Sequence, residues 1–217
     1  MNDTEKLQSN EQNLITLLNL IQAVHKSTNL EQIYKVVLNS IVKFETVDMT
    51  AIYLIDADKN EATLVAQKNF PRMYLKRASV IPKPKGLTWK VVETGKTLKV
   101  DDVRKDPHIG LAGKRLGKHS ALIIPIKLKR RVIGVIWFVS YKEHKFSKKE
   151  VDYLSSFGDQ LAIALSRKKL YENLNKKNRY EKIINTITSS VHKTINIQDV
   201  LENAVESMSR NIEGVRN

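Results

Sequence analysis

Hydrophobic side chains recur with a helical period in the N-terminal part of the chain. Residues 4–26 carry apolar side chains at spacings of three and four, which predicts an amphipathic helix. The tripeptide Ser-Thr-Asn at 27–29 interrupts this pattern, and Thr28 followed by Glu31 has the spacing of a capping box. We therefore expect a second helix to begin at Thr28, with its apolar residues, from Leu30 to Phe44, on one face.

Shorter apolar runs, typical of strands, follow the two helices. Residues 50–55 and 62–66 flank the polar segment DADKN and predict a hairpin. Residues 120–128 and 132–140 are apolar almost throughout, which predicts two central strands with both faces covered. Pro125 lacks a backbone donor, so it predicts a bulge or an unpaired position in the first of these strands.

The remaining segments combine turn signals with one long helical pattern. Residues 68–85 contain three prolines and no periodicity, so we expect a long loop there and a second loop over 101–119. Residues 86–94 predict a short helix ended by Gly95, and residues 97–100 a short strand. A second capping-box spacing, at positions 147 and 150, predicts the start of a long helix that becomes polar on all sides near residues 175–179.

The last part of the chain repeats the first at an offset of 167 residues. Val-His-Lys at 24–26 recurs at 191–193, and the apolar positions of the first two helices agree at the same offset without a gap. His25 and His192 are equivalent in this alignment, which favours a structural role at a helix end. An internal repeat of domain length predicts that residues 183–217 are the first two helices of a second copy, reached through a helical linker over 173–182. On this interpretation the natural protein continues beyond the chain; a chance match between two pairs of amphipathic helices is the alternative.

Positive charge is concentrated in the middle of the chain. The formal net charge is +14, from 37 basic and 23 acidic residues. Residues 68–131 contain 18 basic and 4 acidic side chains, which leaves 19 of each elsewhere. Such a region attracts anions, whether a small ligand, a nucleic acid, an acidic lipid surface or an acidic partner. A solvated surface that promotes solubility explains the same charge equally well.

Several functional classes lack the residues that they need. The chain has no cysteine, which excludes disulfides, thiolate metal sites and cysteine nucleophiles. It has no glycine-rich phosphate loop after a strand, no G-x-S-x-G and no H-E-x-x-H, so we expect neither an enzyme nor a metal site. The longest apolar run, residues 132–139, is far shorter than the roughly 20 residues of a membrane helix, and no signal peptide is visible. The sequence therefore predicts a soluble, cytoplasmic protein without a membrane span.

The order and detail of these segments resemble the GAF domain. GLTWKVVETG at 86–95 is similar to the family's Gly-led short helix ending in Thr-Gly, and VDDVRKDP at 100–107 to its V-x-D…D-P stretch. Residues 120–126, 132–136, 146–150 and 161–165 follow the C-terminal half of the family in order and spacing. The resemblance covers about residues 10–172, and we assign residues 1–172 to this domain.

What the resemblance implies is an α+β fold like that of GAF and PAS domains. The central antiparallel sheet would carry helices on one face and a ligand pocket on the other, and a long C-terminal helix would transmit the signal. GAF domains mostly act as sensory and dimerisation modules ahead of kinase, cyclase, phosphodiesterase or transcription-activating domains, so an output domain is expected outside this chain. We therefore expect a sensory module that binds a small anionic ligand as a parallel homodimer. The alternative is a ligand-free dimerisation and relay module.

The candidate ligand-binding residues come from the basic loops that would wall this pocket. Arginine is favoured because its guanidinium can bind a carboxylate or a phosphate through two hydrogen bonds. The candidates are Arg72, Arg77, Trp89, Arg104, His108, Lys114, Arg115 and Ser120.

The chemistries of particular GAF domains set further limits. The family's cyclic-nucleotide set, Asn-Lys…Phe-x-x-x-Asp-Glu, falls on Ser140, Tyr141, Phe146, Glu150 and Val151, where only the Phe and an Asp-like Glu remain. Bilin attachment and the iron and methionine-sulfoxide chemistries of some members need cysteine, which is absent. Haem stays open through His108 and His119, although loop histidines are more often surface residues. No nucleic-acid module is recognisable, and no pattern identifies a particular cofactor.

Overall fold

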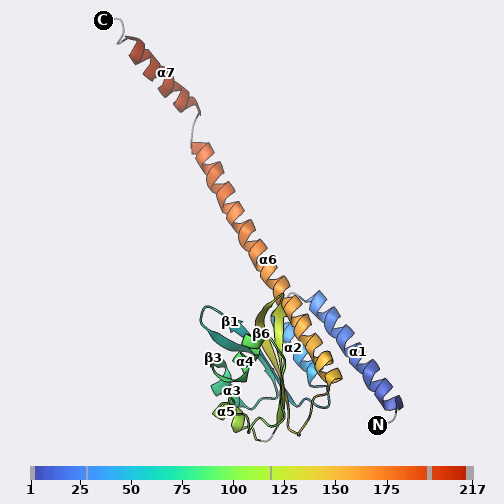
Figure 1. The fold of residues 1–217 in the computed structure, drawn as a ribbon. Coiled ribbons are helices and arrows are strands. Elements are labelled where there is room, and N and C mark those ends of the chain that lie inside the picture. Colours follow the sequence, from blue (N-terminus) through green and yellow to red (C-terminus); the bar gives the residue numbers. More distant parts are fainter. Residues whose placement is uncertain (1–2, 28, 118, 195–196, 214–217) are drawn as a thin grey trace. The chain divides into compact units, whose positions relative to one another are not determined.

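The computed structural model describes residues 3–27, 29–117, 119–194 and 197–213. The chain divides into two compact units, residues 1–168 and 169–217. The elements, in chain order, are α1 (Asp3–Lys26), α2 (Leu30–Ile41), β1 (Met49–Asp56), β2 (Glu61–Lys68), α3 (Arg72–Ala78), β3 (Val80–Pro82), α4 (Gly86–Thr94), β4 (Leu98–Val100), α5 (Leu111–Lys114), β5 (Ser120–Leu128), β6 (Arg131–Ser140), α6 (Lys148–Thr194) and α7 (Ile197–Glu213) (Figure 1).

The first unit is built around one antiparallel sheet of six strands in the order β3-β2-β1-β6-β5-β4. The predicted hairpin is confirmed as β1 and β2, and the two most apolar runs are the inner strands β5 and β6. Pro125 lies opposite Val135 of β6, while β4 pairs only with residues 121–123 of β5. Pro125 therefore has no neighbour on its β4 side, as its missing donor requires.

Alternation along the strands divides the buried side chains between two cores. In β5, Leu122, Ile124 and Ile126 join one core, whereas Ala121 and Ile123 join the other. The first core is covered by α1, α2 and the beginning of α6, and the second by the shorter helices around α4 (Figure 1). Both faces of the inner strands are thus buried, which explains why their sequences are apolar almost throughout.

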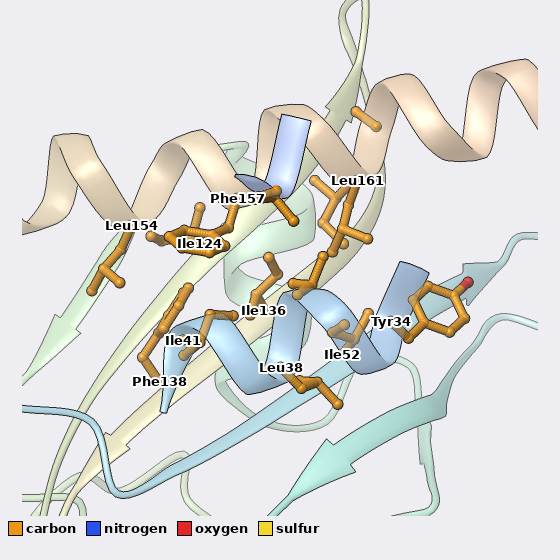
Figure 2. Close-up of a cluster of buried hydrophobic side chains, with 14 of the residues drawn as sticks. Tyr34, Leu38, Ile41, Ile52, Ile124, Ile136, Phe138, Leu154, Phe157 and Leu161 are labelled. Atoms are coloured by element: carbon orange, nitrogen blue, oxygen red, sulfur yellow. The ribbon is translucent and has the colours of Figure 1, made fainter. Parts of the chain in front are cut away.

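The helix-covered core joins side chains from distant parts of the sequence. Figure 2 shows Leu38 and Ile41 of α2 and Phe157 of α6 gathered over strand residues such as Ile124 and Phe138. These five side chains are at most 5% exposed. Each buried side chain of this size contributes about 1.5–3 kcal/mol relative to exposure. This core therefore fixes α2 and the beginning of α6 against the sheet.

Local capping defines where α2 and α6 begin. The predicted capping box of α6 is confirmed: the backbone N–H of Ser147 donates to Oε2 of Glu150 at 2.8 Å, and that of Glu150 donates to Oγ of Ser147 at 3.3 Å. At α2 the cap is Asn29, whose Oδ1 accepts the N–H of Glu31 at 2.9 Å. The predicted cap, Thr28, lies outside the described residues.

The predicted loop over residues 68–85 is wrong, because it contains α3 and β3. Pro71 sits at the N-cap of α3 with φ −61°, a position that needs no backbone donor. The rings of Phe70 and Tyr74 stack across this helix start at 4.8 Å. A proline at the edge of an element marks a boundary and does not prevent the element from forming. The predicted loop over residues 101–119 likewise contains the short helix α5.

The second unit, residues 169–217, consists of the C-terminal part of α6 and of α7. The apolar side chains that the structure describes in this unit are exposed, among them Tyr180, Ile184, Val200 and Val205. The equivalence of His25 and His192 concerns side chains outside the described set. No helix in the described part of the chain is long and apolar enough to cross a membrane.

Candidate functional site

A cavity of about 410 Å³ lies on the sheet face opposite α2. Its walls come from α3, β3, α4, the segment 103–119 and β6. Most of the wall is apolar, with Phe70, Leu87, Val103, Ile109, Trp137 and Val139 among the lining residues. These six side chains are at most 9% exposed and belong to the second core, so one wall of the cavity is the surface of that core.

Few polar groups face this apolar space. Arg77 and Lys85, both exposed, supply two positive charges, and His108 and His119 supply two imidazoles. None of the described lining residues is acidic. The charged side chains among the described lining residues are therefore all basic.

Hydrogen bonds fix the elements around the cavity. Nε1 of Trp137 donates to Oγ1 of Thr88 at 3.1 Å, which joins β6 to α4. Nε1 of Trp89 donates to the carbonyl of Ile81 at 3.1 Å and joins α4 to β3. The Tyr53 hydroxyl donates to the carbonyl of Ala78 at 2.8 Å, and burial raises the pKa of Tyr53 well above its ordinary range. The cavity walls are consequently tied to the sheet rather than left as free loops.

His119 is the buried titratable group of the cavity wall. Its side chain lies beside the start of β5, and the residue is 1% exposed. Burial lowers the pKa of His119, while a hydrogen bond to the Gly117 backbone and the charge of Asp102 act in the opposite direction. Nδ1 of His119 has no hydrogen-bond partner among the described residues. A buried polar nitrogen without a partner is uncommon in folded proteins.

Two of the eight predicted ligand-binding residues, Arg77 and His108, line this cavity. Arg72 is on the same helix as Arg77 but at its first residue, and it does not line the cavity. Lys114 and Arg115 are exposed at the end of α5 and after it. The predicted arginines therefore do not lie together around the cavity.

The other three predicted residues have structural partners. Two nitrogens of the Arg104 side chain contact the carboxylate of Asp102 at 3.2 and 3.3 Å. Ser120 donates through Oγ to the carbonyl of Lys142 at 2.9 Å and accepts the backbone N–H of His144 at 3.0 Å. Trp89 is 4% exposed and packs in the second core outside the cavity lining.

The sequence interpretation missed Lys85, Thr88 and Trp137 as cavity residues. Alternation along β6 places Trp137 on the same face as Val135 and Val139, a signal that could have identified it. No comparable signal exists for Lys85 and Thr88, because their place depends on how α4 packs. In the part of the chain that the structure describes, no group of three or more His, Cys, Asp or Glu side chains could hold a metal ion.

The comparisons with known proteins agree with this architecture. The family profile described as GAF domain matches residues 27–166. The GAF domain of a Coxiella burnetii phosphoenolpyruvate-protein phosphotransferase has a TM-score of 0.67 at 19% identity, covering 75% of this chain and 98% of that one. The corresponding Acinetobacter domain has a TM-score of 0.63 at 20% identity, covering 74% and 97%.

A free methionine-R-sulfoxide reductase from Neisseria meningitidis, solved with its substrate, has a TM-score of 0.60 at 19% identity, covering 72% of this chain and 89% of that one. Some proteins of this fold are therefore enzymes. No curated protein matches the sequence. The profile match over most of the first unit, together with the sheet order and the face that holds the cavity, shows that the chain belongs to the GAF domain family.

Proposed function

We propose that this GAF domain is a sensory module of a cytoplasmic signalling protein, and that it binds a small anionic ligand in the cavity between α3, α4 and β6. The observation that carries the proposal is the charge of the cavity. Arg77 and Lys85 line it, and no described acidic side chain does. An arginine at an apolar cavity can bind a carboxylate or a phosphate through two parallel hydrogen bonds. The domain itself would be regulatory rather than catalytic.

A short chain of contacts supports signal transfer from the cavity to α6. His119 lines the cavity, and the next residue, Ser120, holds the segment after β6 through its bond from the N–H of His144. Nε2 of His144 in turn lies 2.8 Å from Oε1 of Glu150, in the first turn of α6. A ligand that displaces His119 would change the position of Ser120 and hence the start of α6.

Thermal unfolding in the presence of anions tests the binding proposal. The panel is nitrate, phosphate, dicarboxylates and nucleotides, added one at a time to the full chain. A ligand at a hundredfold excess over its dissociation constant should stabilise the folded state by about 2.7 kcal/mol. The absence of a shift with any anion would favour a ligand-free module.

Two arginines of α3 give this experiment a matched control. Arg77 lines the cavity, whereas Arg72 on the same helix is exposed and does not. Arg77→Gln should therefore weaken the stabilising effect of the ligand about tenfold in concentration, and Arg72→Gln should leave it unchanged. Equal effects of the two substitutions would assign the anion effect to general surface charge.

The second candidate function is dimerisation and signal relay without a ligand. Its support is the apolar side chains of the second unit, which stay exposed along α6 and α7. Exposed apolar stripes of this kind mark association surfaces. A parallel homodimer would place both α6 helices so that they deliver a signal to output domains on the same side. Such a dimer is compatible with ligand binding. Nucleic acid is not among the proposed partners.

We also propose that residues 183–217 correspond to the first two helices of a second GAF-like copy, with residues 173–182 as linker. The offset of 167 residues pairs Leu30, the first residue of α2, with Ile197, the first residue of α7. The buried α2 residues Ile33, Tyr34, Leu38 and Ile41 pair with exposed α7 residues Val200, Leu201, Val205 and Met208. Apolar side chains at equivalent positions are thus buried against the sheet in α2 and exposed in α7.

A further inference from the structure

The described lining of the cavity separates into a buried, mostly apolar part and an exposed part that carries the charges. Resting on the proposed function, we propose that the ligand is an amphiphilic anion. Its apolar body occupies the buried part, and its carboxylate or phosphate group lies at the exposed part beside Arg77 and Lys85. Medium-chain and aromatic acids belong to this class, whereas inorganic anions, nucleotides and linear dicarboxylates do not.

Apolar side chains dominate the buried part of the lining. The buried apolar residues, each at most 9% exposed, are Phe70, Ala78, Leu87, Val103, Ile109, Trp137 and Val139. The buried polar residues of the described lining are Thr88 and His119, and the Thr88 hydroxyl already accepts a hydrogen bond from Nε1 of Trp137. Transfer of apolar surface from water to such a wall is favourable in proportion to the area buried. The buried part therefore favours an apolar body.

The basic side chains lie at the exposed part of the lining. Arg77 belongs to the last turn of α3, and Lys85 is the N-cap residue of α4. Both are exposed, as are Val80 and Pro82 of the intervening strand β3. An anionic group in the buried part would lose its hydration away from these side chains, which is unfavourable. At the exposed part the same group keeps contact with water and can bind the guanidinium of Arg77.

The size of the cavity also favours a ligand with a body. Its volume of about 410 Å³ lies in the ordinary range of ligand pockets, which bury most of a ligand's surface against apolar and aromatic side chains. Nitrate or phosphate would leave most of this space to water in contact with apolar walls. A run of methylene groups or an aromatic ring would displace that water and pack against Phe70 and Trp137.

A homologous series of carboxylates tests the body of the ligand. Acetate, butyrate and hexanoate are titrated into the full chain, and binding is measured by calorimetry. Each added methylene should tighten binding about two- to fourfold, because it transfers apolar surface from water to the cavity. Adipate has the carbon number of hexanoate and a second carboxylate, so it should bind about tenfold more weakly than hexanoate. Equal affinity for acetate and hexanoate, or for adipate and hexanoate, would overturn the proposal.

Two further probes keep the body of hexanoate and change its end group. Hexanoate should bind more tightly than 1-hexanol, and hexylamine should bind most weakly of the three, because the charged side chains of the described lining are basic. Added salt should weaken the binding of hexanoate and leave that of hexanol unchanged. Equal affinity for all three probes would overturn the anionic end group.

Two matched substitutions locate the body within the cavity. Val139 is 2% exposed and Val80 is 41% exposed, and both line the cavity. Val139→Phe fills part of the buried space and should remove most of the preference for hexanoate over acetate, whereas Val80→Phe should retain it. An unchanged preference in Val139→Phe would place the body elsewhere on the chain and overturn the proposal. If Val139→Phe fails to fold, the wild-type series decides.

This ligand class and the proposed function can fail separately. Binding of no monocarboxylate would overturn the ligand class. The proposed function itself fails only if the inorganic, dicarboxylate and nucleotide anions also leave the melting temperature unchanged.

Discussion

The charge of His119 depends on how deeply its imidazole is buried at the cavity wall. Burial lowers the pKa of His119 below its ordinary value of 6.5, so the folded protein binds this proton less readily than the unfolded chain does. The stability associated with the neutral ring is fully present above pH 6.5 and is lost as the pH falls below that value. The loss continues until the folded-state pKa is reached.

The unfolding free energy of the wild-type protein should therefore fall on the acid side of pH 6.5. The loss is at most about 1.4 kcal/mol per pH unit for one such group. His119→Asn should remove this dependence, and His108→Asn, at an exposed histidine of the same cavity, should not. Urea unfolding at pH 7.5 and pH 5.5, about one unit on either side of the ordinary value, measures the difference. Parallel pH profiles for wild type and His119→Asn would contradict the assigned burial.

The sequence assigns a cavity residue to a face of the sheet where alternation along a strand applies, whereas residues on loops and short helices cannot be placed in this way. Strand parity places Trp137 on the cavity face with Val135 and Val139. Alternation cannot show that Arg77 lines the cavity and Arg72 does not. Both residues lie on α3, a helix that the proline-rich sequence did not predict. The arginines were predicted from their charge and their position in the basic loops. Which of them face the cavity depends on packing and on ion pairs, such as the one between Arg104 and Asp102.

At the scale of elements, the beginning of α6 depends on the carboxylate of Glu150. Burial raises the pKa of this group, but hydrogen bonds from Ser147 and the neighbouring His144 outweigh it, so the pKa lies below its ordinary value of 4.5. Thr46 also donates to Oε1 of Glu150, at 3.3 Å. The ionised form therefore contributes stability above pH 4.5 that is lost as the pH falls through the lowered pKa.

Glu150→Gln should lower the unfolding free energy at neutral pH by about 0.5–1 kcal/mol, because it removes the charge at the helix start. The difference in unfolding free energy between Glu150→Gln and the wild type should decrease as the pH falls below 4.5. Glu31→Gln, in the exposed first turn of α2, is the control and should have a smaller effect. A gap that is independent of pH would show that the charge of Glu150 does not contribute.

Equivalent positions in α2 and α7 should respond differently to truncation. Leu38 is 5% exposed in the sheet-packed core, whereas Val205, its counterpart at the offset of 167 residues, is 65% exposed. Leu38→Ala should cost about 2–5 kcal/mol of the unfolding free energy of the first unit. Val205→Ala should change it by no more than about 0.5 kcal/mol. Chemical denaturation followed by circular dichroism measures both; a large loss in Val205→Ala would mean that α7 packs against a core.

Elements with a clear local signal, an apolar pattern or a cap, were predicted well, and those without one were not. The hairpin β1–β2, the inner strands, α4 with its Gly95 cap and the start of α6 all follow from local patterns. Gly95 has φ +62°, a conformation that its lack of a side chain permits. In contrast, α3, α5 and β3 are short and depend on packing against the rest of the domain, which local sequence does not encode.

At the scale of the whole molecule, apolar side chains of the second unit are exposed to solvent. Among those that are more than half exposed are Ile184, Ile187, Val200, Leu201, Val205 and Met208. Light scattering should therefore give about twice the chain mass of 24.8 kDa at tens of micromolar. A mass near 24.8 kDa would contradict the dimer. A dimer that persists after deletion of residues 180–217 would place the interface on the helices of the first unit.

The central claim is that a ligand occupies the cavity between α3, α4 and β6, and the two tryptophans of the chain allow a direct measurement. Trp137 lines the cavity and Trp89 does not, so Trp89→Phe leaves a reporter inside the site and Trp137→Phe leaves one outside it. Each variant is titrated with the anion that raises the melting temperature most, and tryptophan emission is recorded. We predict a saturable change in Trp89→Phe, with the midpoint found by calorimetry, and little change in Trp137→Phe. An unchanged Trp137 emission at ligand concentrations that stabilise the fold would place the ligand elsewhere and contradict the account.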